Sequence, residues 1–331
     1  MLLRNDVVKS PEMLWLDALD SEEKGDRGGA LSKAMSVVEL DDSHADAWMA
    51  IARLNLPPTT RGKPMLPELI QCSKAMSALR KVVTHDPENN FAWELGGAML
   101  VDHLGMLEHA LKWWEDCRVN DPYSVTPLVE QIGILVRLGY YEQCKDKLEE
   151  LFSQDMDAPA NKQLLRMHSV KDMVEKAAKM ESSDIFKPND PKNARWDIIR
   201  RMKNRKPITQ NHFLFTFTAP IVFIIGTFAM SAFGKSAVGT ISVFLLILFL
   251  FASITRLTMG LLNSLNRHAL DLDRAIDLES TTGKVCIPGD IRASKLYNSL
   301  LKNRMPCLKE RLDSIVLSNE SLSKNWDLQV P

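Results

Sequence analysis

The 331-residue sequence has few of the features that mark an enzyme or a disulfide-rich secreted protein. Its five cysteines are isolated, with no CxxC pair and no histidine at metal-binding spacing, so we expect reduced thiols packed mostly in helices. The histidines show no consistent pairing with a nucleophile or an acid. We therefore predict no catalytic residues, no metal site and no cofactor, and we expect that the protein is not an enzyme.

Alternating, strand-like runs are also missing from the first 190 residues, where apolar side chains recur three and four positions apart and predict helices. The N-terminal residues MLLRNDVVKSPEM lack the apolar core of a secretory signal, so we expect a cytoplasmic first domain. Residues 1–194 carry 23 basic and 32 acidic side chains, a net charge of −9. That acidic balance argues against nucleic acid as the main partner.

Charge is absent from two adjacent stretches, residues 213–233 and 237–255, which only Gly234-Lys235-Ser236 separates. Each is close to the ~20 residues with which an α-helix crosses ~30 Å of hydrocarbon. Because a three-residue break permits only a tight reversal, we predict a transmembrane helical hairpin over residues 213–257, in contact with a lipid bilayer. The alternative is a buried helical pair in a large soluble core.

The flanks of this hairpin predict its orientation. Residues 195–212 carry six basic side chains and one acid, whereas the turn holds only Lys235. Because positive charge marks the cytoplasmic side, we expect an integral membrane protein with two spans, both termini cytoplasmic and the turn outside. Part of the basic stretch is a candidate for contact with anionic lipid headgroups, the alternative being a plain topology signal. The candidates are Arg200, Arg201, Lys203, Arg205 and Lys206.

A recurring pattern organises the N-terminal half. VVELDDSHADAW ends at Trp48 and VVTHDPENNFAW ends at Trp93, 45 residues later, and the Asp86-Pro87 pair returns as Asp121-Pro122 after 35 residues. Small residues begin the second helix of each successive pair, at spacings of 45, 35 and 34 residues. They are Ala30, Ala75, Ala110 and Cys144. These spacings predict repeated helix–turn–helix units.

The units resemble the tetratricopeptide (TPR) repeat, a helix–turn–helix unit of about 34 residues. Trp93 is the large residue early in a first helix, and Leu138-Gly139-Tyr140-Tyr141 matches the turn of the next unit. The second helix of the third unit carries the expected residues at Ala110, Trp114, Cys117 and Pro122. We predict four repeats at about 11–42, 44–87, 90–122 and 125–156, with an insertion at Asn55–Pro67 in the second.

Together these patterns predict an all-α chain in four parts. A TPR-like α-solenoid with a capping helix occupies residues 1–185, because stacked repeats bury faces that a single repeat leaves open. A basic juxtamembrane linker (186–212) and the hairpin (213–257) follow. A cytoplasmic helical C-terminal segment (258–331) completes the chain, with a loose tail from residue 319.

The resemblance implies that the concave face, formed by the first helices of the repeats, binds extended peptides or partner helices. By register, the candidate protein-binding residues on this face are Met49, Arg53, Glu94, Asp102 and Arg137. The alternative is an ordinary solvated helix face. The family's carboxylate clamp uses paired Asn and Lys or Arg on this face, and the chain lacks that set.

Three functional hypotheses follow. The first is a membrane-anchored TPR scaffold or adaptor that recruits or organises protein partners at the cytoplasmic face of a membrane. The second is an accessory or regulatory subunit of a membrane enzyme or transporter complex, which charges inside the spans would have favoured; there are none. The third is a membrane enzyme whose chemistry lies in residues 256–331, where no cluster of His, Cys and acids stands out in the sequence.

Overall fold

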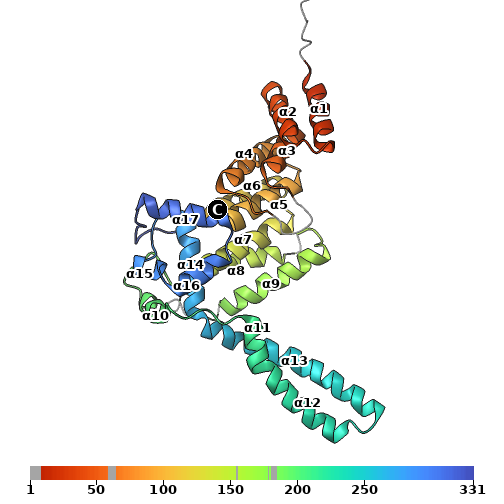
Figure 1. Cartoon of the computed structure of the whole chain (residues 1–331), viewed down its shortest axis with the longest axis vertical. Coiled ribbons are helices and arrows are strands. Elements are labelled where there is room, and N and C mark those ends of the chain that lie inside the picture. The colour runs from red at the N-terminus through yellow and green to blue at the C-terminus, as the bar shows by residue number, and fades with distance from the viewer. Residues whose placement is uncertain (1–8, 59–64, 154–155, 178, 180–184) are drawn as a thin grey trace, which may run out of the picture. The chain divides into compact units, whose positions relative to one another are not determined.

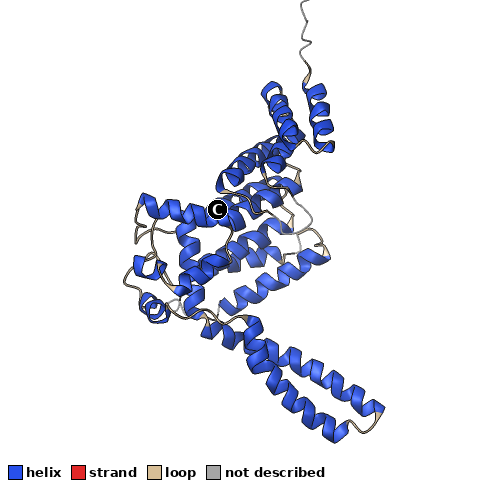
Figure 2. Ribbon diagram, in the orientation of Figure 1, coloured by secondary structure: helices blue, strands red, loops and turns tan. Residues whose placement is uncertain are grey.

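The computed structural model describes residues 9–58, 65–153, 156–177, 179 and 185–331. Over these residues the chain is helical, and the only strand-like feature in them is an isolated bridge between Val285 and Ser321 (Figure 2). The prediction of an all-α fold is confirmed. The chain divides into two compact units. Unit 1 comprises residues 1–189, 276–286 and 304–331, and unit 2 comprises 190–275 and 287–303.

Unit 1 begins with four helix pairs at the positions of the four predicted repeats (Figure 1). Each helix packs on the next one along the chain. The first helix of the third pair continues into a short π-helical turn, η1. The elements are α1 (Pro11–Glu23), α2 (Arg27–Leu40), α3 (Ala45–Asn55), α4 (Leu69–His85), α5 (Asn90–Ala98), η1 (Met99–His103), α6 (Leu107–Asn120), α7 (Val125–Leu138) and α8 (Tyr141–Leu151).

Small residues allow the helices of a pair to approach each other. The four small residues predicted to begin the second helices are all buried, with Ala75, Ala110 and Cys144 fully so. In α5, two glycines lie directly under indole rings: a Cβ on Gly96 would stand 2.4 Å from Trp113 Cζ2, and one on Gly97 2.1 Å from Trp114 Cζ2. Trp113 and Trp114 therefore have a packing role. Their rings fill the contact between α5 and α6 and lie against the backbone of the two glycines.

The helix ends follow from local sequence. Helix α7 ends at Leu138 because Gly139 adopts a left-handed conformation with φ of 87°, from which its N–H reaches the carbonyl oxygen of Leu135 at 2.9 Å. At the start of α5, the Asn89 side chain accepts a hydrogen bond from the Ala92 N–H at 3.1 Å. Such caps determine where each helix of a repeat begins and ends.

Helix α9 (Asn161–Ala177) packs against α7 and α8. Its buried side chains are Met167, Val170, Val174 and Ala177, the apolar stripe expected of a capping helix. Leu164, which the same periodicity places on the stripe, is 40% exposed. It lies in the first turn of α9, before the first buried residue of the stripe, Met167.

The C-terminal part of the chain also contributes to unit 1. Helix α17 (Pro306–Ser318) packs on α4 and η1. The sequence predicted a loose tail after α17, and this prediction is wrong at Leu328. Leu328 is buried, and its N–H donates to the Tyr140 hydroxyl at 3.0 Å. That hydroxyl in turn donates to Asp327 Oδ1 at 2.6 Å. Because these partners are nearly 190 residues apart in the chain, local sequence could not predict the contact.

Unit 2 contains the two apolar stretches. The first forms one continuous helical segment, Gln210–Phe233, and the second forms Ala237–Leu265. The two run side by side as a hairpin (Figure 1). The turn is closed by Ser236, whose hydroxyl accepts a hydrogen bond from the Gly239 N–H at 3.1 Å. The elements of this part are α10 (Arg195–Met202), α11 (Gln210–Phe213), η3 (Leu214–Thr218), α12 (Ala219–Phe233), α13 (Ala237–Leu265), α14 (Arg267–Thr282), α15 (Gly289–Arg292) and α16 (Lys295–Lys302).

Pro220 lies inside the first apolar segment without ending it. A proline has no backbone N–H and crowds the preceding turn of an α-helix. Here the π-helical turn η3 precedes it directly, and the Ala219 N–H bonds to the Leu214 carbonyl, five residues back. The wider turn accommodates Pro220, a role that π-helical insertions commonly have in long helices.

The linker before the hairpin is hydrogen-bonded to Asn266, the residue that caps the C-terminal end of α13. The Ile208 N–H donates to Asn266 Oδ1 at 2.9 Å, and Asn266 Nδ2 donates back to the Ile208 carbonyl at 2.8 Å. Two apolar residues of α10, Trp196 and Ile199, are buried. These contacts give the basic linker a defined structure within unit 2.

Candidate functional site

The first-helix face of the repeats carries an acidic group. Glu94 of α5 and Asp102 of η1 are exposed, and their charges act on Glu130 of α7. Burial raises the pKa of Glu130, the carboxylates of Asp102 and Glu94 raise it further, and the Arg166 guanidinium of α9 lowers it. The structure thus brings together two of the five predicted face residues and adds Glu130, which the sequence analysis did not select.

Arg53 and Met49 lie on α3, and each contacts another part of unit 1. The Arg53 guanidinium forms an ion pair with Glu22 of α1, in which Nη2 lies 2.7 Å from Oε2. The hydrogen bond from Arg53 lowers the pKa of Glu22. Met49 is half-buried and packs against the core of unit 1. Both side chains already have partners within the chain, and Arg53 connects the first and second repeats.

Arg137 of α7 faces the C-terminal part of the chain. Its Nη2 lies 2.8 Å from Asp277 Oδ1, and its Nε lies 3.1 Å from Oδ2. Arg304 adds a third hydrogen bond, with Nη2 2.9 Å from Asp277 Oδ1. Asp277 is only 3% exposed. Two arginines thus share one buried carboxylate, and the two bonds from Arg137 join α7 to the C-terminal part of the chain.

A cysteine–histidine cluster lies between α4, η1 and α17. The Cys307 thiol donates to the His103 carbonyl oxygen at 2.9 Å, and its Sγ lies 4.0 Å from His103 Nδ1. Hydrogen bonding from the Cys72 thiol, with a further contribution from His103, lowers the pKa of Cys307. The sequence analysis missed this group because its members are 31 and 204 residues apart, a separation at which no spacing motif exists.

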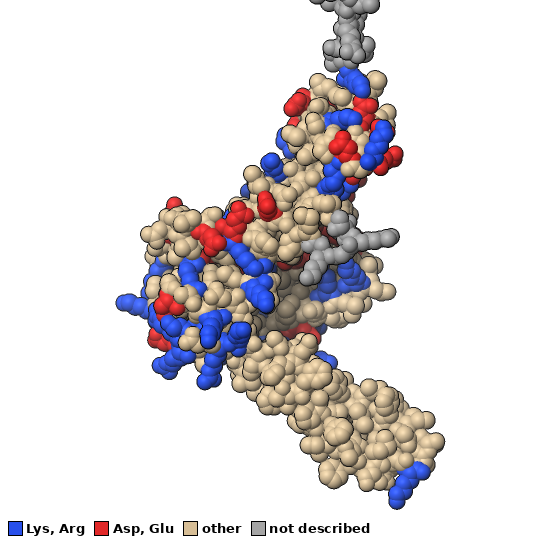
Figure 3. All heavy atoms as spheres, in the orientation of Figure 1, with Lys and Arg blue, Asp and Glu red and all other residues tan. Residues whose placement is uncertain are grey.

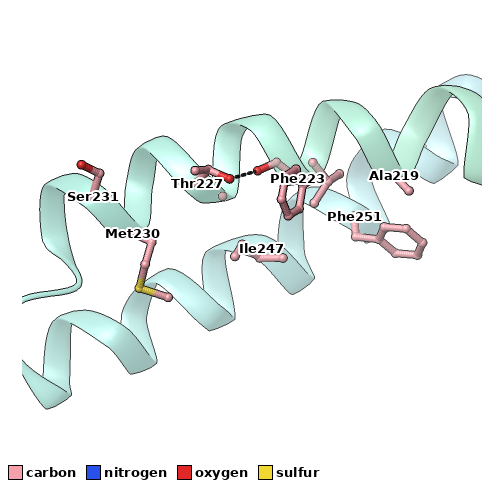
Figure 4. Close-up of a pocket in the computed structure, with 9 residues that line it drawn as sticks. Ala219, Phe223, Thr227, Met230, Ser231, Ile247 and Phe251 are labelled. Atoms are coloured by element: carbon pink, nitrogen blue, oxygen red, sulfur yellow. Dashed lines mark hydrogen bonds between the residues drawn. The ribbon is translucent and has the colours of Figure 1, made fainter.

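The hairpin carries an apolar groove between its two helices, with a volume of about 610 Å³ (Figure 4). Gly226 is one of its lining residues, and a Cβ added there would stand 2.8 Å from Ile247 Cδ1. The Thr227 hydroxyl is satisfied within its own helix by the Phe223 carbonyl at 2.8 Å. The lining residues are Ala219, Val222, Phe223, Gly226, Thr227, Met230, Ser231, Ile247 and Phe251.

The basic linker is partly neutralised by the chain itself. Lys203 Nζ lies 3.2 Å from Asp290 Oδ2, and Arg200 Nε lies 3.8 Å from the same oxygen. Arg201, Arg205 and Lys206 are exposed. Of the five candidate lipid-contacting residues, the last three therefore present the more available positive charge.

No protein-family model matches the sequence, and no curated protein matches it. Among solved structures, the chain is similar to the MamA protein at 12% identity and a TM-score of 0.35, over 51% of this chain and 86% of MamA. It is also similar to a tetratricopeptide repeat protein from Parabacteroides merdae at 11% identity and a TM-score of 0.39, over 93% and 91% of the two chains. The helix pairs of unit 1 are TPR-like. That description rests on the chain's own helix positions and buried small residues.

Proposed function

We propose that this protein is a membrane-anchored TPR-like scaffold, in which the hairpin of unit 2 holds the chain to a membrane and the repeats of unit 1 recruit a protein partner. The observation that carries the proposal is the exposure of the two apolar helices. In the most apolar 18-residue windows of Gln210–Phe233 and Ala237–Leu265, only 28% and 6% of the residues are buried within the described part of the chain. The core helices of a soluble protein would be mostly buried.

The charge pattern supports insertion of both helices in a bilayer. From residue 213 to residue 255 the sequence carries one charged side chain, Lys235 of the turn at the tip of the hairpin, and the next is Arg256 (Figure 3). An exposed apolar surface of this extent is costly in water and favourable in hydrocarbon. The bases Arg201, Arg205 and Lys206 of the linker are exposed, and such a positive flank supports a cytoplasmic position for the linker.

The first prediction concerns topology. In a Cys286→Ser background, cysteines introduced at Ser32, Lys235 and Ser318 all occupy exposed positions. We expect a membrane-impermeant maleimide to label Lys235→Cys in intact cells, and to label the other two only after permeabilisation. Strong labelling of both Ser32→Cys and Ser318→Cys in intact cells would contradict the proposed orientation. Labelling of Lys235→Cys only after permeabilisation, as for the other two cysteines, would contradict exposure of the turn outside the membrane.

A protein partner on the concave face is the second part of the proposal. The five residues selected from the sequence remain its candidate contacts. Glu94, Asp102 and Arg53 are exposed, and Arg53 is already paired with Glu22. Because Glu94 and Asp102 lie near Glu130, a partner segment that brings a basic side chain would be attracted to this face. Arg137 is less suited as a probe of binding, since changing it would also disturb buried Asp277.

The second prediction tests that face by charge reversal. We expect the double variant Glu94→Lys/Asp102→Lys to lose most of the partner recovered by cross-linking in the native membrane, with an unchanged melting temperature. Exposed positions usually alter stability by no more than ~0.5 kcal/mol. The matched control is Glu149→Lys, an exposed position on the second helix of the fourth pair. Recovery that is equal in the double variant and the control would remove this face from the proposal.

The alternative function is an accessory subunit of a membrane complex, and the groove between α12 and α13 favours it. Small residues and an open apolar groove are features with which membrane helices pack against each other. Exchanging residues 210–265 for an unrelated two-helix anchor separates the two proposals. A scaffold would keep its cross-linked partner, whereas a subunit that binds through its hairpin would lose it.

A further inference from the structure

We propose that Cys72, His103 and Cys307 form a binding site for a zinc ion, which fastens the C-terminal helix α17 to the repeats. One ring nitrogen of His103 and the two Sγ atoms all lie within 4.8 Å of one another. Within the described residues, these three side chains come from three separate elements of unit 1: α4, η1 and the first turn of α17. Both cysteines are fully buried, and His103 is half-buried.

The distances are close to those that a tetrahedral zinc ion requires. With Zn–S bonds of about 2.3 Å and Zn–N bonds of about 2.0–2.1 Å, ligand atoms stand roughly 3.5–3.8 Å apart. The Cys307 Sγ to His103 Nδ1 distance is 4.0 Å, so small side-chain rotations would complete the geometry. Three protein ligands leave the fourth position of the ion for water, as in zinc sites with two cysteines and one histidine.

The ligand chemistry selects the ion. Two thiolates and an imidazole suit Zn²⁺ or Cu(I), whereas calcium and magnesium prefer oxygen ligands, which are absent from this three-residue set. Binding of Zn²⁺ by both cysteines forms two Zn–S bonds and releases two thiol protons. The Cys307 thiol then no longer donates to the His103 carbonyl, so the ion replaces that hydrogen bond in joining α17 to η1.

The surrounding backbone holds the three ligands in place. Gly105, two residues after His103, has φ of 63°, and a Cβ there would stand 2.6 Å from Leu308 Cδ1. This close approach seats the first turn of α17 directly against the end of η1. The π-helical turn that ends at His103 alters the direction of its side chain relative to an α-helix, and such turns recur at functional sites.

A small cavity lies on the His103 side of the site. It has a volume of about 180 Å³, and His103 is among the residues that line it. Met65 and Met99 also line it, so the approach to the imidazole is largely apolar with two thioether sulfurs.

The test uses the full chain, purified in detergent with a phosphine reductant and without chelator, then dialysed against buffered Zn²⁺. We expect about one zinc per chain by plasma mass spectrometry, and a thiolate charge-transfer band when Co²⁺ replaces Zn²⁺. Cys307→Ser and His103→Gln should weaken zinc binding by more than the ~10–100-fold that loss of a supporting partner costs. Cys286→Ser is the control, because it makes the same substitution at a cysteine outside the cluster. It should leave the zinc content at about one ion per chain.

Other readouts distinguish the proposal from a mere packing or disulfide role. Hydrogen exchange of residues 306–318 should speed up when a chelator removes zinc from the parent protein, and should not respond to chelator in Cys307→Ser. Helical circular dichroism confirms that each variant is folded. Absence of zinc from the reduced, folded parent after dialysis would overturn the proposal, as would a Cys72–Cys307 disulfide that persists under the reductant. Stoichiometric copper after equal exposure to both metals would overturn the assignment of the ion.

Discussion

Asp277→Ala is expected to lower the free energy of unfolding of unit 1 by about 3 kcal/mol, because two arginines share this buried carboxylate. Removing one partner of a buried ion pair costs roughly 3–5 kcal/mol. The side chains of Arg137 and Arg304 are 29% and 18% exposed, so water partly re-solvates them and the lower end of that range applies. Asp277→Asn, which keeps the shape and loses the charge, should cost less.

Thermal melting of the full chain, followed by helical circular dichroism, measures this effect. For a unit of this size, about 3 kcal/mol corresponds to a decrease of roughly 6–12 °C in melting temperature. The control is Glu142→Ala, which removes an ion pair with Lys145 from a side chain that is 84% exposed, and should cost less than about 0.5 kcal/mol. If Asp277→Ala melts with the parent, the cluster does not stabilise the contact between α7 and the C-terminal part of unit 1.

Gly97→Val is expected to destabilise unit 1 by about 3 kcal/mol or more, above the ~1–3 kcal/mol typical of an overpacked core. A Cβ at this position would stand 2.1 Å from Trp114 Cζ2 and 2.6 Å from Cε2. Trp114 is buried, so its ring has no free space into which it can move. The substitution must therefore separate α5 from α6, the two helices of the third repeat.

Gly133→Ala provides a control of opposite sign. Gly133 lies inside α7, and no atom stands within 4 Å of a Cβ built there. Because alanine loses less backbone entropy than glycine on helix formation, the change should stabilise the unit by about 0.5–1 kcal/mol. Melting temperatures of the two variants should move in opposite directions from the parent. A Gly97→Val variant as stable as the parent would show that the α5–α6 contact is looser than the structure describes.

The helix pairs could be predicted because their determinants are local or recur at short spacing. Small residues such as Ala75 and Ala110 begin the second helices, and both are fully buried in the structure. Turn residues such as Gly139 end a helix through their own backbone conformation. The two apolar segments were equally visible, since a run without charge needs no distant partner to be recognised.

The candidate face could be predicted only in part. Helical register placed Glu94 and Asp102 on the exposed side of the first helices, and both are exposed. Register gave no sign that Arg137 pairs with Asp277, because that partner lies 140 residues further along the chain. Nor did it select Glu130, whose environment depends on Arg166 of α9 and on two other carboxylates.

Local sequence was enough to predict which segments are helical, where small residues permit helices to pair, and which 40 or so residues form two uncharged runs. These properties depend on neighbours within one or two helical turns. Only the tertiary structure decided that the C-terminal residues belong to the repeats, through the carboxylate of Asp277, the thiol of Cys307 and the backbone of Leu328. Such contacts join residues more than 130 positions apart, and their free energy depends on burial and geometry that exist only after the helices have packed.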